Sequence, residues 1–217
     1  LHQSGLALVF AGAGSGKTRV LTTRAAWLID QQELNPEEIL LMTFTNKAAQ
    51  EMNQRVQTMT GHQLTYSGTF HRICALILRQ HGKRLGLRPH YTIYDTQDQR
   101  SLVRNIYKDK GYDHKQFNRR AVKSYISKLK NKLISPQEAS QQAESDFERH
   151  AARVYHIYQQ RLRKQQAVDF DDLLYKTVRL FNSNPKILDQ YQHQFAHVLV
   201  DEYQDTNKAQ YQLVKQL

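Results

Sequence analysis

The sequence predicts an α/β fold in which a parallel sheet is interrupted along the chain by an all-helical module. Short, near-continuous apolar runs are typical of strands that are buried on both faces of a parallel sheet. Four strand-like runs are present, and a helical pattern follows each, which is the alternation expected of α/β proteins. The runs are 6–11, 39–44, 66–70 and 195–202, and the helical patterns are 17–30, 47–59, 70–82 and 208 onward.

The segment from about 85 to 166 differs, because helical spacing dominates it apart from a strand-like stretch at 91–95. Within it, 119–133 has an apolar face and a basic face, made of Val122, Ile126, Leu129 and Leu133 and of Arg119, Lys123 and Lys130. A helix is predicted to start at Ser135 as N-cap, with Pro136 and Glu138 behind it, and another to cover 145–164. After the module, 169–181 predicts a helix with acids in its first turn, and 182–185 ends it.

The composition is that of an ordinary soluble globular protein, with 217 residues, 40% hydrophobic and 24% charged. No apolar run approaches the roughly 18 residues of a membrane span, and the start shows no signal-peptide pattern. The single cysteine, Cys74, fits a reducing compartment, so we expect a cytoplasmic protein without membrane partners. Because the chain starts without Met and ends inside a helical pattern, we expect it to be part of a longer protein.

Positive charge is confined to the middle of the chain. Between Lys83 and Gln166 there are 19 Lys and Arg against 8 Asp and Glu, and the rest of the chain holds 12 of each. The whole net charge of +11 therefore comes from one segment. This concentration favours a polyanionic partner, although a solvated basic face is the simpler alternative.

The stretch AGAGSGKT, residues 11–18, follows the first apolar run and opens a helical pattern. Its glycines allow the backbone to wrap around one anion, and the helix start adds a positive dipole end. Lys17 supplies charge for the β- and γ-phosphates, and Thr18 offers a hydroxyl to Mg²⁺. This is the Walker A arrangement of P-loop proteins, except that Ala11 stands where the strict pattern has Gly. The alternative is a glycine-rich turn that only caps a helix.

The run HVLVDE, residues 197–202, supplies the carboxylates that such a loop requires. Asp201 stands where an acid would orient Mg²⁺ through water, and Glu202 is suited to act as general base toward an attacking water. Two adjacent acids after a strand also occur as plain solvated turns, but here the loop and the acids support each other. The predicted chemistry is Mg²⁺-dependent hydrolysis of a nucleoside triphosphate.

Five stretches occur together in a characteristic order: AGAGSGKTRVL, TFTNKAAQEM, GTFHRICALILR, DFDDLL and LVDEYQDTN. With these, nearly the whole chain resembles the amino-terminal part of UvrD/Rep/PcrA-type superfamily 1 DNA helicases, most of all PcrA-like members. The resemblance implies a RecA-like P-loop NTPase domain with a discontinuous sheet, domain 1A, over 1–84 and 167–217, and an inserted helical domain 1B over 85–166. It also implies ATP-driven 3′–5′ movement on single-stranded DNA in replication, repair or recombination.

Site residues follow from the resemblance position by position. The ATP-binding loop would comprise Ala11, Gly12, Ala13, Gly14, Ser15, Gly16, Lys17, Thr18 and Arg19. Thr18 and Asp201 would organise Mg²⁺, and Lys17, Glu202 and Gln204 would serve catalysis, with Gln204 sensing the γ-phosphate. Single-stranded DNA would contact Phe44, Thr45, Asn46, Thr69 and His71. Arg72 stands where many members have a small residue, so its role is open.

The single-strand contacts also make sense from the residues alone, because both segments follow predicted strands and emerge at the ligand-binding edge of the sheet. Phe44 can stack on a base, and Thr and Asn can bind phosphate or sugar. The alternatives are a core role for Phe44 and local hydrogen bonding for His71. In the helical module, phosphate contacts of the duplex are expected from Arg119, Arg120, Lys123, Lys128, Lys130 and Lys132.

We expect this chain to act at a junction of single- and double-stranded DNA, as a monomer by itself, with repair or replication accessory proteins as partners. It lacks the second RecA-like domain that supplies transition-state arginines in the family, so it should hydrolyse ATP poorly alone. Two rival functions share this front end. One is the helicase subunit of a RecB/AddA-type helicase–nuclease, and the other is a nucleic-acid-stimulated ATPase switch that does not unwind. A small-molecule kinase is the least favoured, since the basic module would have no purpose.

Overall fold

The computed structural model describes residues 5–10, 12 and 14–217. It has the predicted α/β class and contains two compact units. The first unit comprises Leu1–Ile73 and Tyr191–Gln204, and the second comprises Cys74–Gln190 and Asp205–Leu217. These units divide the chain differently from the predicted domains, 1–84 with 167–217 and 85–166, so those boundaries stay a prediction.

The first unit is built on a parallel sheet of three strands in the order β2-β1-β5. The strands are β1 (Ile39–Thr43), β2 (Tyr66–Thr69) and β5 (His197–Val200), three of the four predicted. All five residues of the central strand β1 are buried, as its continuous apolar run predicts. Thr43 pairs with Thr69 and Met42 with Val200, so the three strands end at the same edge of the sheet.

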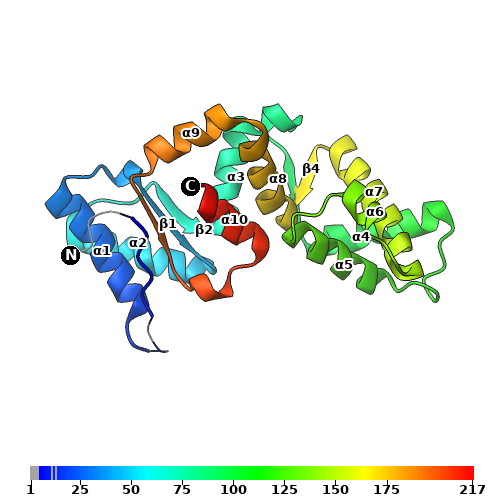
Figure 1. Cartoon of the computed structure of the whole chain (residues 1–217), viewed down its shortest axis with the longest axis horizontal. Helices are drawn as coiled ribbons and strands as arrows, with labels where there is room; N and C mark the ends of the chain where they lie inside the picture. The colour runs from blue at the N-terminus through cyan, green and yellow to red at the C-terminus, as the bar shows by residue number, and fades with distance from the viewer. Residues whose placement is uncertain (1–4, 11, 13) are drawn as a thin grey trace. The chain divides into compact units, whose positions relative to one another are not determined.

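Two helices pack beside this sheet, α1 (Lys17–Gln32) and α2 (Asn46–Thr60) (Figure 1). Their apolar faces share a core with β1 that includes Leu28, Met52 and Val56. A short 3₁₀ helix, η1 (Pro36–Glu38), leads into β1, and η3 (Tyr203–Asp205) follows β5. Two more helices begin or end in this unit, α3 (Phe70–His81) and α9 (Pro185–Gln194).

The strand predicted at 6–11 is wrong for the part that the structure describes, because residues 6–10 form no strand. Leu6 is 96% exposed and Phe10 is 88% exposed, and the described chain places no strand beside β5 on the side away from β1. An apolar run becomes a buried strand only when a neighbouring strand satisfies its backbone and covers its side chains. Residue 11 lies outside the described residues.

The second unit is mainly helical, and Figure 1 shows α4 to α7 grouped together. In chain order it contains η2 (Gly82–Leu85), β3 (Thr92–Tyr94), α4 (Thr96–Lys110), α5 (Arg119–Asn131), α6 (Pro136–Gln141), α7 (Asp146–Lys164), β4 (Ala167–Asp169), α8 (Phe170–Ser183) and α10 (Lys208–Gln216). Tyr155, Tyr158 and Ile106 are among the buried residues of its core. The strand β3 pairs in parallel with β4, which the sequence did not predict.

Capping explains where several of these helices begin. Ser135 Oγ accepts a hydrogen bond from the Glu138 N–H at 3.2 Å, and the Glu138 carboxylate accepts one from the Ser135 N–H at 2.7 Å. This reciprocal pair is the predicted capping box. One predicted helical position is wrong: α5 ends at Asn131, and Leu133 has a positive φ of 63°, so it is not on the apolar face. None of the helices in the described ranges has the length and apolarity needed to cross a membrane.

Candidate functional site

The glycine turn before α1 has a backbone that favours glycine. The φ angle is 75° at Gly14 and 91° at Gly16, which is the N-cap of α1. The Gly12 carbonyl accepts hydrogen bonds from Ser15 Oγ at 2.6 Å and from Lys17 Nζ at 3.4 Å. The turn therefore folds back on the start of α1, where backbone N–H groups and the helix dipole favour an anion.

Of the other residues predicted for this loop, Ala11 and Ala13 lie outside the described residues. Arg19 is exposed in the first turn of α1. Thr18 is partly buried, and its backbone carbonyl accepts a hydrogen bond from Thr22 Oγ1 at 3.1 Å. Among the described residues of the loop, Lys17 and Thr18 contact the acids that follow β5.

Asp201 directly follows β5 and is only 4% exposed. Its N–H donates to the Met42 carbonyl at 2.9 Å, which extends the β1–β5 pairing by one residue and fixes the position of the carboxylate. Asp201 Oδ2 accepts a hydrogen bond from Thr18 Oγ1 at 3.3 Å, and Oδ1 accepts one from the Glu202 N–H at 3.1 Å. The hydroxyl and the carboxylate, 183 residues apart in sequence, therefore meet as two neighbouring oxygen donors.

Glu202 is held in an unusual backbone conformation, with φ at 51°, in the left-handed region that non-glycine residues seldom adopt. Its Oε1 lies 3.9 Å from Lys17 Nζ, and its Oε2 accepts a hydrogen bond from Gln204 Nε2. The Lys17 and Glu202 side chains keep 24% and 39% of their surface exposed. Strained backbone of this kind gathers at functional sites, because it can aim a side chain that a relaxed turn would not.

Chemically, this arrangement places an anion-binding turn, a mobile cation, a hydroxyl and two carboxylates within a few ångströms. The hydroxyl and Asp201 are the oxygen ligands that Mg²⁺ prefers. The Lys17 charge is suited to a phosphate, and Glu202 has the solvent access that a base toward water requires. The two clusters predicted from the sequence are therefore in contact, while the role of each residue stays a prediction.

The residues predicted to contact single-stranded DNA lie at the same sheet edge. Phe44, Thr45 and Asn46 leave the end of β1, and Thr69 ends β2 beside it. The centroids of the Phe44 and Phe70 rings lie 5.5 Å apart, with an angle of 59° between the ring planes. Phe44 is half-buried, so it packs against the core and still leaves part of its surface accessible.

Both threonines at this edge also act locally. Thr45 Oγ1 caps α2 by accepting from the Ala48 N–H at 3.1 Å, and Thr69 Oγ1 accepts from the Arg72 N–H at 3.3 Å. Asn46 is exposed at the first position of α2, and His71 is half-buried in the first turn of α3. Asn46 is thus an accessible polar side chain that no helix cap occupies.

Arg72, whose role the sequence left open, packs against the strand that precedes it. A Cβ atom placed on Gly68 would lie 2.6 Å from Arg72 Cδ, closer than carbon atoms approach. The side chain of Arg72 therefore lies over the glycine backbone of β2, and a larger residue at position 68 would force this flexible side chain to shift. Arg72 is exposed and adds a cation to this edge.

A basic groove of about 690 Å³ lies in the second unit between α4 and α5. It includes Arg119, Arg120 and Lys123, three of the predicted DNA contacts. Sequence reasoning missed Arg100 and Arg104 of α4 and His114, which line the same groove. The i, i+4 spacing of Arg100 and Arg104 is the signal that could have found them, because it places both on one helix face. We refer to these six residues as the basic groove.

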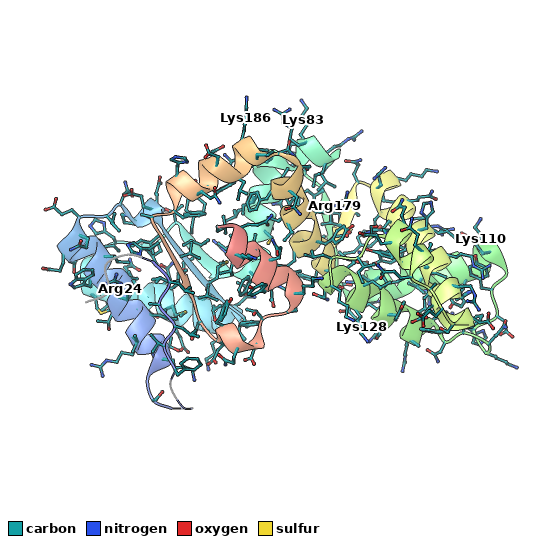
Figure 2. All side chains as sticks on the ribbon, in the orientation of Figure 1. Arg24, Lys83, Lys110, Lys128, Arg179 and Lys186 are labelled. Atoms are coloured by element: carbon teal, nitrogen blue, oxygen red, sulfur yellow. The ribbon has the colours of Figure 1, made fainter. Side chains whose placement is uncertain are left out.

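Lys130 contradicts the prediction that it contacts DNA. It is 0% exposed, and its Nζ lies 2.7 Å from Asp169 Oδ2 and 3.0 Å from Asp172 Oδ1. Burial alone would lower the Lys130 pKa, but the two carboxylates outweigh it and raise the pKa, so the lysine stays charged. A phosphate cannot reach a cation enclosed in this way. Lys128 and Lys132 are exposed instead, and Figure 2 labels Lys128 on α5.

Further hydrogen bonds complete the surroundings of Lys130. Tyr158 Oη donates to Asp169 Oδ2 at 2.8 Å, and Gln159 Nε2 donates to Asp172 Oδ1 at 2.8 Å. The Asp172 N–H donates to Asp169 Oδ1 at 2.8 Å, because Asp169 is also the N-cap of α8. We call Lys130, Tyr158, Asp169 and Asp172 the buried ion cluster.

Comparisons with known proteins agree with this organisation. The family model "UvrD/REP helicase N-terminal domain" matches residues 1–217. The protein named ATP-dependent DNA helicase PcrA of Staphylococcus aureus (strain Mu50) is 46% identical over 212 residues, 97% of this chain. The protein of the same name from Staphylococcus epidermidis (strain RP62A) also has 46% identity over 212 residues. The chain spans 29% of the length of these relatives. The chain belongs to the UvrD/REP helicase N-terminal domain family.

Proposed function

We propose that this chain is the ATP-binding amino-terminal portion of an ATP-dependent DNA helicase that moves 3′ to 5′ on single-stranded DNA. The process it serves is replication, repair or recombination. One observation carries the proposal: Thr18 Oγ1 lies 3.3 Å from Asp201 and Lys17 Nζ lies 3.9 Å from Glu202. The loop and the acid pair can therefore act on one bound triphosphate.

In this proposal the glycine turn at residues 11–19 binds the phosphates of ATP. The backbone N–H groups of Gly14 and Gly16 surround the phosphates, and Lys17 neutralises the β- and γ-phosphates. The adjacent oxygens of Thr18 and Asp201 fit a magnesium ion, which supplies charge neutralisation to the triphosphate when bound. Lys17 then exchanges its loose contact with Glu202 for contact with the phosphate.

Glu202 is the base that withdraws a proton from the attacking water. Its backbone conformation and the hydrogen bond from Gln204 orient the carboxylate, and its exposure admits water. Gln204 is placed to respond to the γ-phosphate through Glu202, which would make the acid sensitive to whether ATP or its product is bound.

Single-stranded DNA is proposed to lie across the carboxyl edge of β1 and β2. Phe44 stacks on a base with its open face, for about 1–3 kcal/mol. Thr45, Asn46, Thr69 and His71 bind phosphate or sugar without reading sequence. Arg72 adds a charge at this edge.

Duplex DNA ahead of a junction is proposed to lie on the basic groove, where six cationic or titratable side chains meet and no carboxylate is among the lining residues. Contacts to the phosphate backbone through Arg119, Arg120 and Lys123 would be independent of sequence and strongly dependent on salt. We also propose a cytoplasmic location and repair or replication proteins as accessory partners.

Strand displacement by the full-length protein tests this proposal on tailed duplexes of both polarities. We expect ATP-dependent unwinding of 3′-tailed duplexes, and we expect Lys17→Ala to abolish it. Lys186→Ala, which replaces an exposed lysine of α9, is the matched control and should retain activity. Retained unwinding in Lys17→Ala would show that the loop does not bind the ATP that drives the reaction. ATP hydrolysis without strand separation would support a switch and contradict the helicase.

A further inference from the structure

A second hollow in the second unit is lined by none of the residues assigned above to ATP or DNA. It has a volume of about 480 Å³ and is lined by residues of η2, α6, α7, β4 and α8. Ligand pockets for small molecules commonly measure about 300–1,000 Å³. The hollow is therefore large enough for one nucleotide. We call it the α7–α8 pocket.

The helix α7 presents a polar stripe to this pocket. His156, Gln159, Gln160 and Arg163 all line it, and their spacing of i, i+3, i+4 and i+7 places them on one helix face. Gln159 Nε2 is fixed by its bond to Asp172, and His156 Nε2 lies 2.9 Å from Gln160 Nε2. His156, Gln160 and Arg163 are exposed, so this stripe lies on the solvent-facing side of α7 and offers polar groups to a ligand that arrives from water.

The helix α8 adds two cations over a buried aromatic floor. Tyr175 is 5% exposed, and its Oη accepts a hydrogen bond from Arg179 Nη1 at 3.0 Å. The same ring lies 5.7 Å from the Arg179 guanidinium carbon. Lys176 lines the pocket one residue after Tyr175. Arg179, labelled in Figure 2, is therefore oriented by the tyrosine before any ligand arrives.

The charge of the pocket selects an anion. Arg163, Lys176 and Arg179 line it, and no Asp or Glu is among its lining residues. Two carboxylates stand near it. Glu138 interacts with Arg179, but its Oε2 accepts the Ser135 N–H at 2.7 Å. Asp172 is bound to Lys130 in the buried ion cluster. Neither cancels three cations, so an incoming anion would find a net positive field.

We propose that the α7–α8 pocket binds the phosphate of a nucleotide, with its exposed amides contacting the base. Arg163 and Arg179 contact the phosphate oxygens, since guanidinium groups match phosphate geometry. Gln137 and Gln160, both exposed at the rim, offer donors and acceptors to a base edge. A nucleotide carries a phosphate for the cations and a base edge for the amides in one small molecule that matches a pocket of about 480 Å³, and we therefore favour it over an acidic peptide. It comes either free from solution or as one unit of a DNA strand.

Nuclear magnetic resonance of the 217-residue chain carrying Lys17→Ala tests this site, because that substitution removes the side-chain charge that the glycine turn offers to a phosphate, and signals of the pocket are read separately from those of the turn. The probes are dTMP, thymidine, inorganic phosphate, a thymidine tetranucleotide and an Asp-Glu tetrapeptide. We expect dTMP to shift backbone and arginine side-chain signals of 156–163 and 175–179 with saturation. Arg163→Gln with Arg179→Gln should weaken dTMP binding about tenfold or more.

The matched control is Arg153→Gln with Lys164→Gln, which removes the same charge from exposed positions of α7 outside the pocket lining. It should bind dTMP as the parent does. Arg163→Gln alone serves if the double variant unfolds. Tighter binding of the tetranucleotide assigns the site to a strand, and equal binding assigns it to a free nucleotide.

Three results would overturn the proposal. If thymidine bound with the same affinity as dTMP, the pocket would not recognise the phosphate. If inorganic phosphate bound with the same affinity as dTMP, the pocket would not recognise the base. Shifts produced by the acidic peptide but not by dTMP would make the pocket a protein-docking site. The proposed helicase function can fail independently, because the pocket signals are read separately from those of the glycine turn.

Discussion

Two lysine–carboxylate clusters in this molecule use the same residue types in opposite ways. In the first unit, Lys17 lies 3.9 Å from Glu202, and Thr18 lies 3.3 Å from Asp201. In the second unit, Lys130 lies 2.7 Å and 3.0 Å from Asp169 and Asp172, with Tyr158 Oη at 2.8 Å. Each cluster has a lysine, two acids and a hydroxyl, but only the first has long contacts and exposed side chains.

The difference separates a site that can exchange partners from one that cannot. A buried ion pair has lost its hydration, so its charges depend on each other and on their hydrogen bonds. In the buried ion cluster every charge has short contacts, and at most 3% of any charged side chain is exposed to a ligand. The partly exposed lysine and glutamate of the first cluster can leave each other at little cost, because water can replace the lost contact.

The largest effect expected from this comparison is on stability. Lys130→Met should lower the free energy of unfolding by about 3–5 kcal/mol, because it leaves two buried carboxylates without their cation. Lys17→Met should change it by less than about 0.5 kcal/mol. Urea unfolding of the 217-residue chain measures both. Equal stability of the two variants would mean that the second cluster is as replaceable as the first.

The next effect is on catalysis, where a substitution in the first cluster should matter more than one in the second. Glu202→Gln should lower DNA-stimulated ATP turnover of the full-length protein about 100-fold or more, since general base catalysis contributes about that much. Its stability should be unchanged. Glu51→Gln, on the exposed surface of α2, is the control with the same chemical change. Normal turnover in Glu202→Gln would assign the base to another group.

A smaller effect is expected from single hydrogen bonds. Tyr158→Phe removes the bond to buried Asp169 and should cost about 2 kcal/mol, because the acceptor is charged and shielded from water. Tyr125→Phe removes a 3.2 Å bond to Glu148, which water can replace, and should cost about 0.5 kcal/mol. Thermal or urea unfolding compares them. A smaller loss for Tyr158→Phe would contradict the role given to burial.

The smallest effect concerns pH in the helical core outside the buried ion cluster. His150 stacks on Phe117 at 4.4 Å, and its Nε2 lies 2.9 Å from Tyr107 Oη. Burial first, and then the Arg153 charge, lower the His150 pKa below the ordinary 6.5. The unfolded chain therefore takes up a proton first, and stability should fall as pH drops below about 6.5.

His150→Phe should reduce that slope of unfolding free energy against pH. The slope that remains belongs to groups such as His81, whose pKa is also lowered by burial. An unaltered slope in His150→Phe would show that this histidine does not titrate differently in the folded and unfolded chains.

The sequence predicted the parts of the fold that depend on local signals. The continuous apolar runs predicted β1 and β5, and the capping box at Ser135 predicted the start of α6. The approach of the glycine turn to the acids after β5 was also predicted, because a phosphate-binding loop requires carboxylates that can share its Mg²⁺, although residues 6–10 before the turn form no strand. The catalytic and binding roles of those residues remain predictions.

What the sequence could not predict depends on distant partners. Lys130 and Lys128 look alike in a basic helix, and only Asp169 and Asp172, about 40 positions later, decide that one is buried. The strand β4 has three residues, too few to show a period, and is defined by pairing with β3. The apolar run at 6–10 has strand composition but no neighbour within the described chain.

The buried ion cluster also constrains how this chain can diverge. A protein that loses Lys130 alone keeps two unpaired negative charges in its interior and is destabilised, so selection acts against that variant. Exchange of the lysine together with both acids for apolar residues of similar volume avoids that intermediate. In divergent homologues, these three positions should consequently change in concert, whereas the exposed lysines of the same helix should drift one at a time.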